Sequence, residues 1–122
     1  MVKKTVLLVD DEKDLVDILT LRFQADGYEV IQALDGKEGL EKAKSEKPDM
    51  IILDVMMPKL NGYQVCKELK QDAKYKHIPI IMLTAKAQES DKFWGMETGA
   101  DDYVTKPFDF GNLLETVKKY LK

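Results

Sequence analysis

The feature that most constrains the fold is a regular alternation of short apolar runs with segments of helical periodicity. Runs typical of strands occupy residues 6–9, 29–33, 50–53, 80–83 and 103–104. Segments with apolar residues at helical spacing follow them, at residues 14–26, 36–45, 63–72, 88–98 and 110–121. Because strands alternate with helices, the pattern predicts a parallel sheet covered by helices on both faces. Continuous apolar runs are typical of such strands, since both of their faces are buried.

Five strand–helix units in this order predict a doubly wound α/β fold. We expect a flavodoxin-like (βα)5 architecture with a five-stranded parallel sheet in the strand order 2-1-3-4-5, and another open α/β sheet is the alternative. Gly27, Gly36, Pro48 and Gly99 stand where predicted elements end or begin, as turn signals do. A chain of 122 residues without repeats or a linker is expected to form one domain, residues 1–122.

Composition excludes several classes of protein. The net charge is −3, lysines and acids alternate along the chain, and Arg22 is the only arginine. Direct binding to nucleic acid would need a basic stripe, so we do not expect it. The single cysteine, Cys66, fits a reducing compartment. No apolar run approaches a secretory signal or the roughly 20 residues of a membrane span, so we expect a cytoplasmic protein with no membrane contact.

Polar residues follow the apolar runs at the places where ligands bind in open α/β sheets, beyond the carboxyl ends of the strands. In chain order these residues are Asp10, Asp11 and Glu12, then Asp54, then Thr84, and then Thr105, Lys106 and Pro107. The carboxyl ends of parallel strands meet at one edge of the sheet. The sequence therefore predicts a site that combines carboxylates, a hydroxyl and an ammonium.

This combination indicates phosphoryl chemistry. Three close carboxylates repel one another unless a cation is present, and hard oxygen ligands suit Mg²⁺. Mg²⁺ usually takes one or two carboxylates with waters and phosphate oxygens, which leaves one carboxylate free to act. A free carboxylate can attack phosphorus and form an aspartyl phosphate. The metal, the Lys106 ammonium and the Thr84 hydroxyl would then stabilise the equatorial oxygens.

Five short motifs stand at or near the strand ends. They are LLVDDE at residues 7–12, ILDVMMP at residues 52–58 with Gly62 beyond it, LTA at residues 83–85, GADDY at residues 99–103 and KPF at residues 106–108. Each motif alone is weak. In this order and at these spacings, they resemble the receiver domain of bacterial two-component response regulators, including stand-alone chemotaxis regulators. The resemblance extends over residues 4–121.

The resemblance implies a role for each carboxylate at the site. Asp54 corresponds to the residue that accepts the phosphoryl group. Asp10, Asp11 and Asp54 would hold Mg²⁺, or Mn²⁺ in its place, together with the backbone carbonyl of Met56. Taken without their partners, Asp10 and Asp11 could instead form a solvated turn, and Asp54 could be an acid that caps a helix.

The resemblance also implies a switch. Thr84 would bond a phosphoryl oxygen, and Lys106 would pair with the phosphoryl group. Tyr103 resembles the aromatic residue that turns inward when the threonine moves, and a packed aromatic without a switch role is the alternative. The Lys106–Pro107 peptide bond is expected to be cis, which costs little before proline. The family communicates its state through the fourth helix, fifth strand and fifth helix, here residues 88–121.

The function implied is a phosphorylation-dependent signalling switch that catalyses only its own phosphorylation and dephosphorylation. A sensor histidine kinase, a phosphotransfer protein or a small phosphodonor would supply the group, and a downstream protein or output domain would respond. We expect a monomer or a weak, phosphorylation-dependent dimer. Leu15, Ile18 and Leu21 on the first helix are predicted to form the kinase docking surface. His77, the only histidine, is interpreted as a surface residue, so the donor histidine would be on a partner.

Three other interpretations fit less well. A haloacid-dehalogenase-like phosphatase usually has a second aspartate two residues after its nucleophile, where this chain has Met56. A pseudo-receiver that has lost phosphorylation would not need the complete set of acids, threonine and lysine. A nucleotide-binding protein would have a glycine-rich loop after the first strand.

Two family positions that tune the loss of the phosphoryl group hold Met56 and Lys86, and we expect a phosphoryl lifetime of minutes or longer.

Overall fold

The computed structural model describes residues 3–57, 59–85 and 99–121, and within them the expected alternation is present. The strands are β1 (Thr5–Val9), β2 (Glu29–Ala33), β3 (Met50–Asp54), β4 (Ile80–Ala85) and β5 (Asp102–Lys106). The helices are α1 (Lys13–Ala25), α2 (Gly36–Glu46), α3 (Gly62–Lys70) and α5 (Phe110–Tyr120). The helix predicted at residues 88–98 lies outside the described residues.

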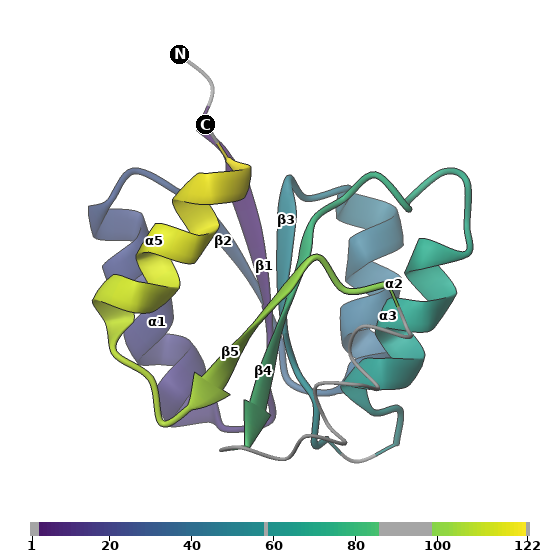
Figure 1. Cartoon of the computed structure of the whole chain (residues 1–122), viewed down its shortest axis with the longest axis horizontal. Coiled ribbons are helices and arrows are strands. Elements are labelled where there is room, and N and C mark those ends of the chain that lie inside the picture. Colours follow the sequence, from purple (N-terminus) through teal and green to yellow (C-terminus); the bar gives the residue numbers. More distant parts are fainter. Residues whose placement is uncertain (1–2, 58, 86–98, 122) are drawn as a thin grey trace.

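The strands form one parallel sheet in the order β2-β1-β3-β4-β5, which confirms the predicted flavodoxin-like fold. Figure 1 shows α1 and α5 on one face of the sheet and α2 and α3 on the other. The strand order reverses between β1 and β3, which is where open α/β sheets place their ligands. Val9 is paired with Leu53 across these two strands, so the residues that follow them emerge side by side.

Each face of the sheet has its own apolar core, because successive side chains of a strand point to opposite faces. On β1, Val6 and Leu8 belong to the cluster with α1 and α5, whereas Leu7 and Val9 belong to the cluster with α2 and α3. These four side chains are at most 2% exposed. Burial on both faces explains why the central strands are continuous apolar runs in the sequence.

Helix α1 buries the stripe that the sequence predicts, formed by Val16, Leu19 and Phe23. Ile18 and Leu21 lie off this stripe and are 56% and 68% exposed. The helix ends before Gly27, whose φ of +91° favours glycine. Helix α1, which begins shortly after the carboxyl end of β1, therefore presents apolar side chains to solvent along its length.

Two close backbone approaches fix the loop that follows β3. A Cβ atom on Gly36, the first residue of α2, would overlap the carbonyl oxygen of Leu60 in that loop. A Cβ atom on Gly62, the first residue of α3, would overlap the carbonyl oxygen of Asp54. The loop is thus held between the N-termini of two helices, and its position depends on both glycines.

Strand β5 is longer than the predicted residues 103–104, since it extends from Asp102 to Lys106. Its five residues are all half-buried, so an edge position does not require a continuous apolar run. Backbone pairing continues to Lys106, which lies opposite Ala85 of β4.

Among the described helices, none has the length and apolar character that crossing a membrane would require.

Candidate functional site

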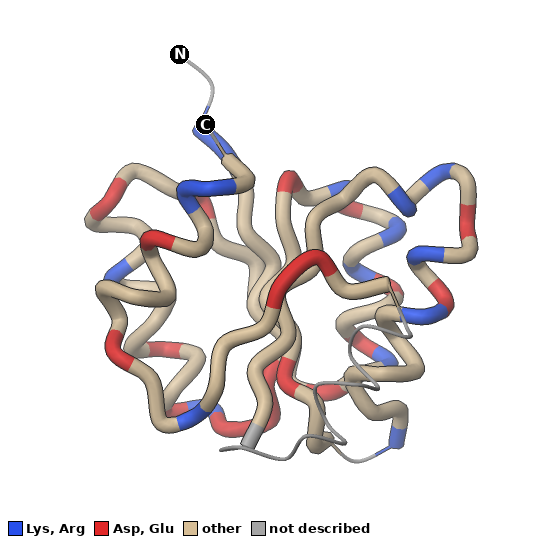
Figure 2. Tube along the Cα trace, viewed as in Figure 1, with Lys and Arg blue, Asp and Glu red and all other residues tan. Residues whose placement is uncertain are grey.

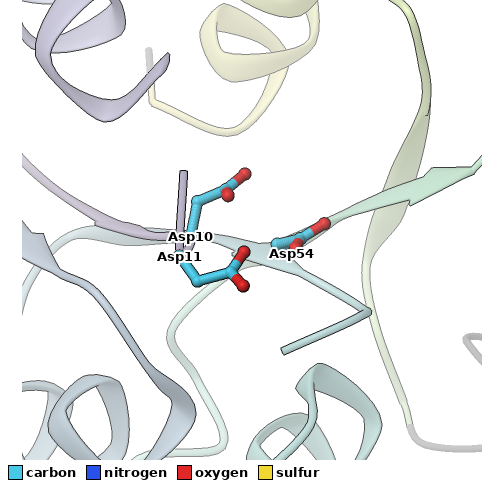
Figure 3. Close-up of side chains that lie close together, drawn as sticks. All are labelled: Asp10, Asp11 and Asp54. Carbon is cyan, nitrogen blue, oxygen red and sulfur yellow. The ribbon is translucent and has the colours of Figure 1, made fainter. Parts of the chain in front are cut away.

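Three carboxylates meet at the carboxyl ends of the two central strands. Asp10 follows β1, Asp11 is next in the chain, and Asp54 is the last residue of β3. Figure 3 shows the three side chains gathered at this edge of the sheet. One oxygen of each lies within 4.8 Å of the others. Asp10 and Asp54 are 2% and 6% exposed, whereas Asp11 faces solvent.

Lys106 brings an ammonium to this cluster from the end of β5. Its Nζ atom donates hydrogen bonds to Asp10 Oδ2 at 2.9 Å and to Glu12 Oε1 at 3.2 Å, and it lies 3.2 Å from Asp54 Oδ1. The peptide bond between Lys106 and Pro107 is cis. Burial by itself would lower the pKa of the lysine, but the hydrogen bond to Asp10 and the charge of Asp54 outweigh burial and raise it. Lys106 is therefore a permanent cation.

Asp54 has an unusual protonation equilibrium. Burial, and after it the negative charge of Asp10, raise the pKa of Asp54 from 3.8 to about 6, while Lys106 opposes this shift in part. One lysine does not compensate for three adjacent carboxylates. A further cation close to Asp54 would favour its ionised form, which is the form needed for nucleophilic attack.

The donor set fits a hard divalent cation. Carboxylate oxygens, two of them from nearly buried residues, converge within the range that one ion can span. Burial first, and then the charge of Asp10, raise the pKa of Asp54, and a bound cation would favour its ionised form. Met56, the expected source of a carbonyl ligand, lies two residues beyond Asp54 and borders the same cleft.

The carboxylates of Asp11 and Asp54 border a cleft of about 530 Å³. Its lining combines charged residues with apolar ones, and it consists of Asp11, Glu12, Leu15, Asp54, Met56, Lys106, Pro107 and Phe108. The Met56 side chain is 72% exposed at the opening. Asp54 is thus accessible to a reactant from one side although little of its surface is exposed.

Thr84 and Tyr103 lie on the two strands beside the cluster. Thr84 is near the end of β4, is 2% exposed, and lies opposite Thr105 of β5. Tyr103 is half-buried and packs against the core that lies under α2 and α3. The structure thus places Thr84 near the end of β4 and Tyr103 opposite Met82, further back along the sheet, and their switch role stays a prediction. Lys86 lies outside the described residues.

Sequence reasoning placed the side chains of the cluster correctly at one edge, but it missed the contact between Glu12 and Lys106. The available signal was a glutamate at the start of a helix, where a shorter capping side chain is usual. His77 is exposed and Cys66 is buried, as interpreted from the sequence.

Comparison with known proteins identifies the family. The family described as the response regulator receiver domain matches residues 6–118. The chain belongs to this family. It is 51% identical over 119 residues to the alkaline phosphatase synthesis transcriptional regulatory protein PhoP of Bacillus subtilis, which is 98% of this chain and 49% of that protein. The receiver domain thus spans about half the length of the curated relatives it matches.

Solved structures agree with this assignment. A putative response regulator from Chloroflexus aurantiacus is 40% identical, with a TM-score of 0.93 and 98% of both chains covered. The receiver domain of a sensor histidine kinase from Pseudomonas aeruginosa is 28% identical, with a TM-score of 0.89 and 98% of both chains covered. That receiver was solved with a magnesium ion coordinated in its active-site cleft.

Proposed function

We propose that this receiver domain is a phosphorylation-dependent switch of a two-component system, and that Asp54 accepts the phosphoryl group. The observation that carries the proposal is a carboxylate that borders an open cleft and lies 3.2 Å from the Lys106 ammonium. Asp10 is a poorer nucleophile, because its two oxygens already accept hydrogen bonds from the Glu12 backbone N–H and from Lys106.

In this reaction a carboxylate oxygen of Asp54 attacks phosphorus and forms a P–O bond. The P–N bond of a phosphohistidine breaks, and the departing imidazole keeps the electron pair and takes up a proton. With a small phosphodonor, the bond to its leaving oxygen breaks instead. Lys106 stays close enough to pair with the transferred group, and the Thr84 hydroxyl is expected to donate to one of its oxygens.

The proposed cofactor is Mg²⁺, with Mn²⁺ as an alternative. Asp10, Asp11, Asp54 and the backbone carbonyl of Met56 would hold it. The cation would supply neutralising charge for the carboxylates and for the phosphoryl oxygens. The converging carboxylates and the magnesium ion in the related Pseudomonas aeruginosa receiver support this choice.

The response follows from the added charge. A phosphoryl group brings about −1.5 to −2 charges and three strong acceptors. Movement of Thr84 toward it would let Tyr103 repack, and couplings of this kind are typically about 1–3 kcal/mol. The output surface would be residues 88–121, of which residues 99–121, with β5 and α5, lie within the described part. A downstream protein or an output domain would bind this surface. The domain itself would be a monomer or a weak, phosphorylation-dependent dimer.

A kinase docking surface is proposed on α1, beside the cleft. Leu15 lines the cleft, and Ile18 and Leu21 continue an apolar strip along the exposed side of the helix. A sensor histidine kinase or a phosphotransfer protein would present its phosphohistidine to Asp54 from this side. Such a partner implies a cytoplasmic location. The only reactions that the domain itself would catalyse are its own phosphorylation and dephosphorylation.

Labelling with a small phosphodonor tests the function. The purified chain is incubated with acetyl phosphate and Mg²⁺, and the phosphorylated fraction is separated on a phosphate-affinity gel. Wild type is expected to be labelled and Asp54→Asn to remain unlabelled. A pseudo-receiver would show no labelling in either protein, and a phosphatase would instead release phosphate steadily from many small esters.

The phosphoryl group is predicted to be long-lived, with a half-life of minutes or longer. Hydrolysis needs a water molecule oriented toward phosphorus, and the exposed thioether of Met56 orders water poorly. Decay of the labelled protein after removal of donor measures the half-life. A wild-type half-life of a few seconds would contradict this prediction, and Met56→Asn, which offers an amide to water, is expected to decay faster than wild type.

A further inference from the structure

We propose that Glu12 is a positioning residue for Lys106. In this proposal, Glu12 holds the ammonium at the mouth of the cleft when a divalent cation takes the oxygens of Asp10 and Asp54. The inference rests on the proposed function, since it deepens the account of how the same site is loaded. It is independent of the identity of the phosphodonor.

The first observation is a conflict over the same carboxylates. Lys106 Nζ lies 2.9 Å from Asp10 Oδ2 and 3.2 Å from Asp54 Oδ1. The same two residues, with Asp11, are the group that can hold a cation. An ammonium and a divalent cation repel each other at such range. Lys106 must therefore withdraw from at least part of this contact when the cation binds.

The second observation is where Lys106 can go. Glu12 Oε1 lies 3.2 Å from the same Nζ atom. The Glu12 side chain is 64% exposed, against 3% for Asp10 and 8% for Asp54. Glu12 is thus the outermost of the three partners, and it is not a member of the carboxylate group that can hold the cation. Lys106 can retain this partner while it gives up the other two.

The third observation is that Glu12 does not perform the usual task of its position. It is the N-cap residue of α1, and its side chain makes no capping hydrogen bond. The other three described helices each begin with a side chain that does cap, from Asp35, Asn61 and Asp109. A short side chain would serve the helix better. The long side chain of glutamate reaches Lys106 instead, which points to a role in the site.

The consequence concerns cation affinity. With Glu12 present, displaced Lys106 keeps an ionic partner, so the cation displaces it at lower cost. Without Glu12, Lys106 has only Asp10 and Asp54 and competes with the cation directly. Glu12 also keeps the ammonium beside Asp54, where the phosphoryl group arrives.

A double-mutant cycle on cation affinity tests the proposal. Isothermal titration calorimetry gives the Kd for Mg²⁺ in wild type, Glu12→Gln, Lys106→Met and the double variant, without any phosphodonor. Glu12→Gln is expected to raise the Kd about three- to fivefold when Lys106 is present, and less than about 1.5-fold when it is replaced. Asp14→Asn, which removes an exposed charge from the same helical turn, is expected to change the Kd by less than about 1.5-fold.

Glu12→Ser separates positioning from a purely structural role. Serine can cap the helix but cannot reach Lys106. This variant is expected to resist urea without Mg²⁺ at least as well as wild type, and yet to show the same rise in Kd as Glu12→Gln. If the Kd for Mg²⁺ rises only in those Glu12 variants that are also less stable than wild type, Glu12 has a structural role in folding and not a positioning role.

Two results would overturn the proposal. One is an equal rise in Kd with and without Lys106, because the effect would then be loss of negative charge alone. The other is an unchanged Kd in Glu12→Gln. Failure of the proposed function is a different result, namely no labelling of wild type by acetyl phosphate at saturating Mg²⁺, and the calorimetric cycle does not depend on it.

Discussion

At the scale of single residues, the site is governed by the burial of Asp54 beside a second carboxylate, that of Asp10. Asp10 and Asp54 are nearly buried, and Lys106 is the ammonium that contacts both. Burial and the charge of Asp10 together bring the pKa of Asp54 to about 6. The side chain that is proposed to react is therefore one whose ionisation the surrounding fold disfavours.

This shift predicts a pH-dependent effect of Asp54→Asn on stability in the absence of divalent cations. Because the pKa of Asp54 is higher in the folded chain, the folded state binds more protons than the unfolded state between about pH 4 and pH 6. Asp54 thus lowers the free energy of unfolding as pH rises through this window, by up to roughly 3 kcal/mol. The stability of Asp54→Asn relative to wild type should rise over the same window, as measured by urea unfolding with a chelator present.

Asp14→Asn is the control for this measurement, since Asp14 is an exposed acid of α1 outside the cluster. Its effect on stability should be small, without the rise expected for Asp54→Asn. A difference between Asp54→Asn and wild type that stays constant from pH 4 to pH 7 would contradict the raised pKa of Asp54.

At the scale of elements, two helix N-termini determine where the loop after Asp54 lies. Gly36 of α2 packs on the Leu60 carbonyl, and Gly62 of α3 packs on the Asp54 carbonyl. The side chains of Asp35 and Asn61 cap these helices, because they accept hydrogen bonds from the backbone N–H groups of Glu38 and Gln64. The loop that is expected to supply the Met56 carbonyl ligand is therefore positioned by these backbone contacts, together with the burial of its own Val55 and Met57 side chains in the core.

Gly36→Ala is predicted to destabilise the fold and weaken Mg²⁺ binding together, because the added methyl group would displace Leu60 and the loop. A cost of about 1–3 kcal/mol in urea unfolding is typical of such overpacking. Gly111→Ala in α5 is the matched control, since its Cβ would lie 3.5 Å from its nearest neighbour. That variant should be as stable as wild type or slightly more so. Unchanged stability and Mg²⁺ affinity in Gly36→Ala would contradict this account of the loop.

Helix α1 carries the second prediction at this scale. Replacing Ile18 and Leu21 together by alanine removes exposed apolar surface, so stability should change by less than about 0.5 kcal/mol. Phosphotransfer from the cognate kinase is expected to slow at least about tenfold, since buried apolar contacts dominate such interfaces. Labelling by acetyl phosphate, which needs no docking, should keep its wild-type rate. If the rate of phosphorylation falls equally with the kinase and with acetyl phosphate, the substitutions impair the phosphorylation site and not the docking of the kinase.

At the scale of the whole molecule, the cation is expected to link the two halves of the fold. The proposed ligands come from the ends of β1 and β3 and from the following loop, so binding should occur only in the folded state. Mg²⁺ at 100 times its Kd is then predicted to raise the free energy of unfolding by about 2.7 kcal/mol. Asp11→Asn, at an exposed position, should show a smaller increase at the same Mg²⁺ concentration, and a chelator should abolish both.

Most of the architecture could be predicted from the sequence because its determinants are local. The runs of β1, β3 and β4 are buried on both faces and therefore stand out, and turn signals such as Gly27 mark where helices end. The strand ends then place the acids, the threonine and the lysine at one edge. Figure 2 shows basic and acidic residues interspersed along the described trace, as the alternation of charges in the sequence indicates.

The remainder depends on contacts between residues distant in sequence. The length of β5 is set by pairing with β4, so its polar ends carry no apolar signal. The sharing of Lys106 among Asp10, Glu12 and Asp54 spans more than 90 residues for two of the three pairs. The approach of Gly36 to Leu60 likewise depends on how α2 packs, which local sequence does not determine.

The central claim is tested most directly by locating the phosphoryl group on the chain. The protein is treated with acetyl phosphate and Mg²⁺ and then with borohydride, which reduces an aspartyl phosphate to homoserine, and the digested peptides are sequenced by mass spectrometry. The account predicts homoserine at position 54 of the wild-type chain, and none at positions 10 and 11. Homoserine at position 10 or 11 with an unmodified Asp54, or none at any aspartate, would contradict it.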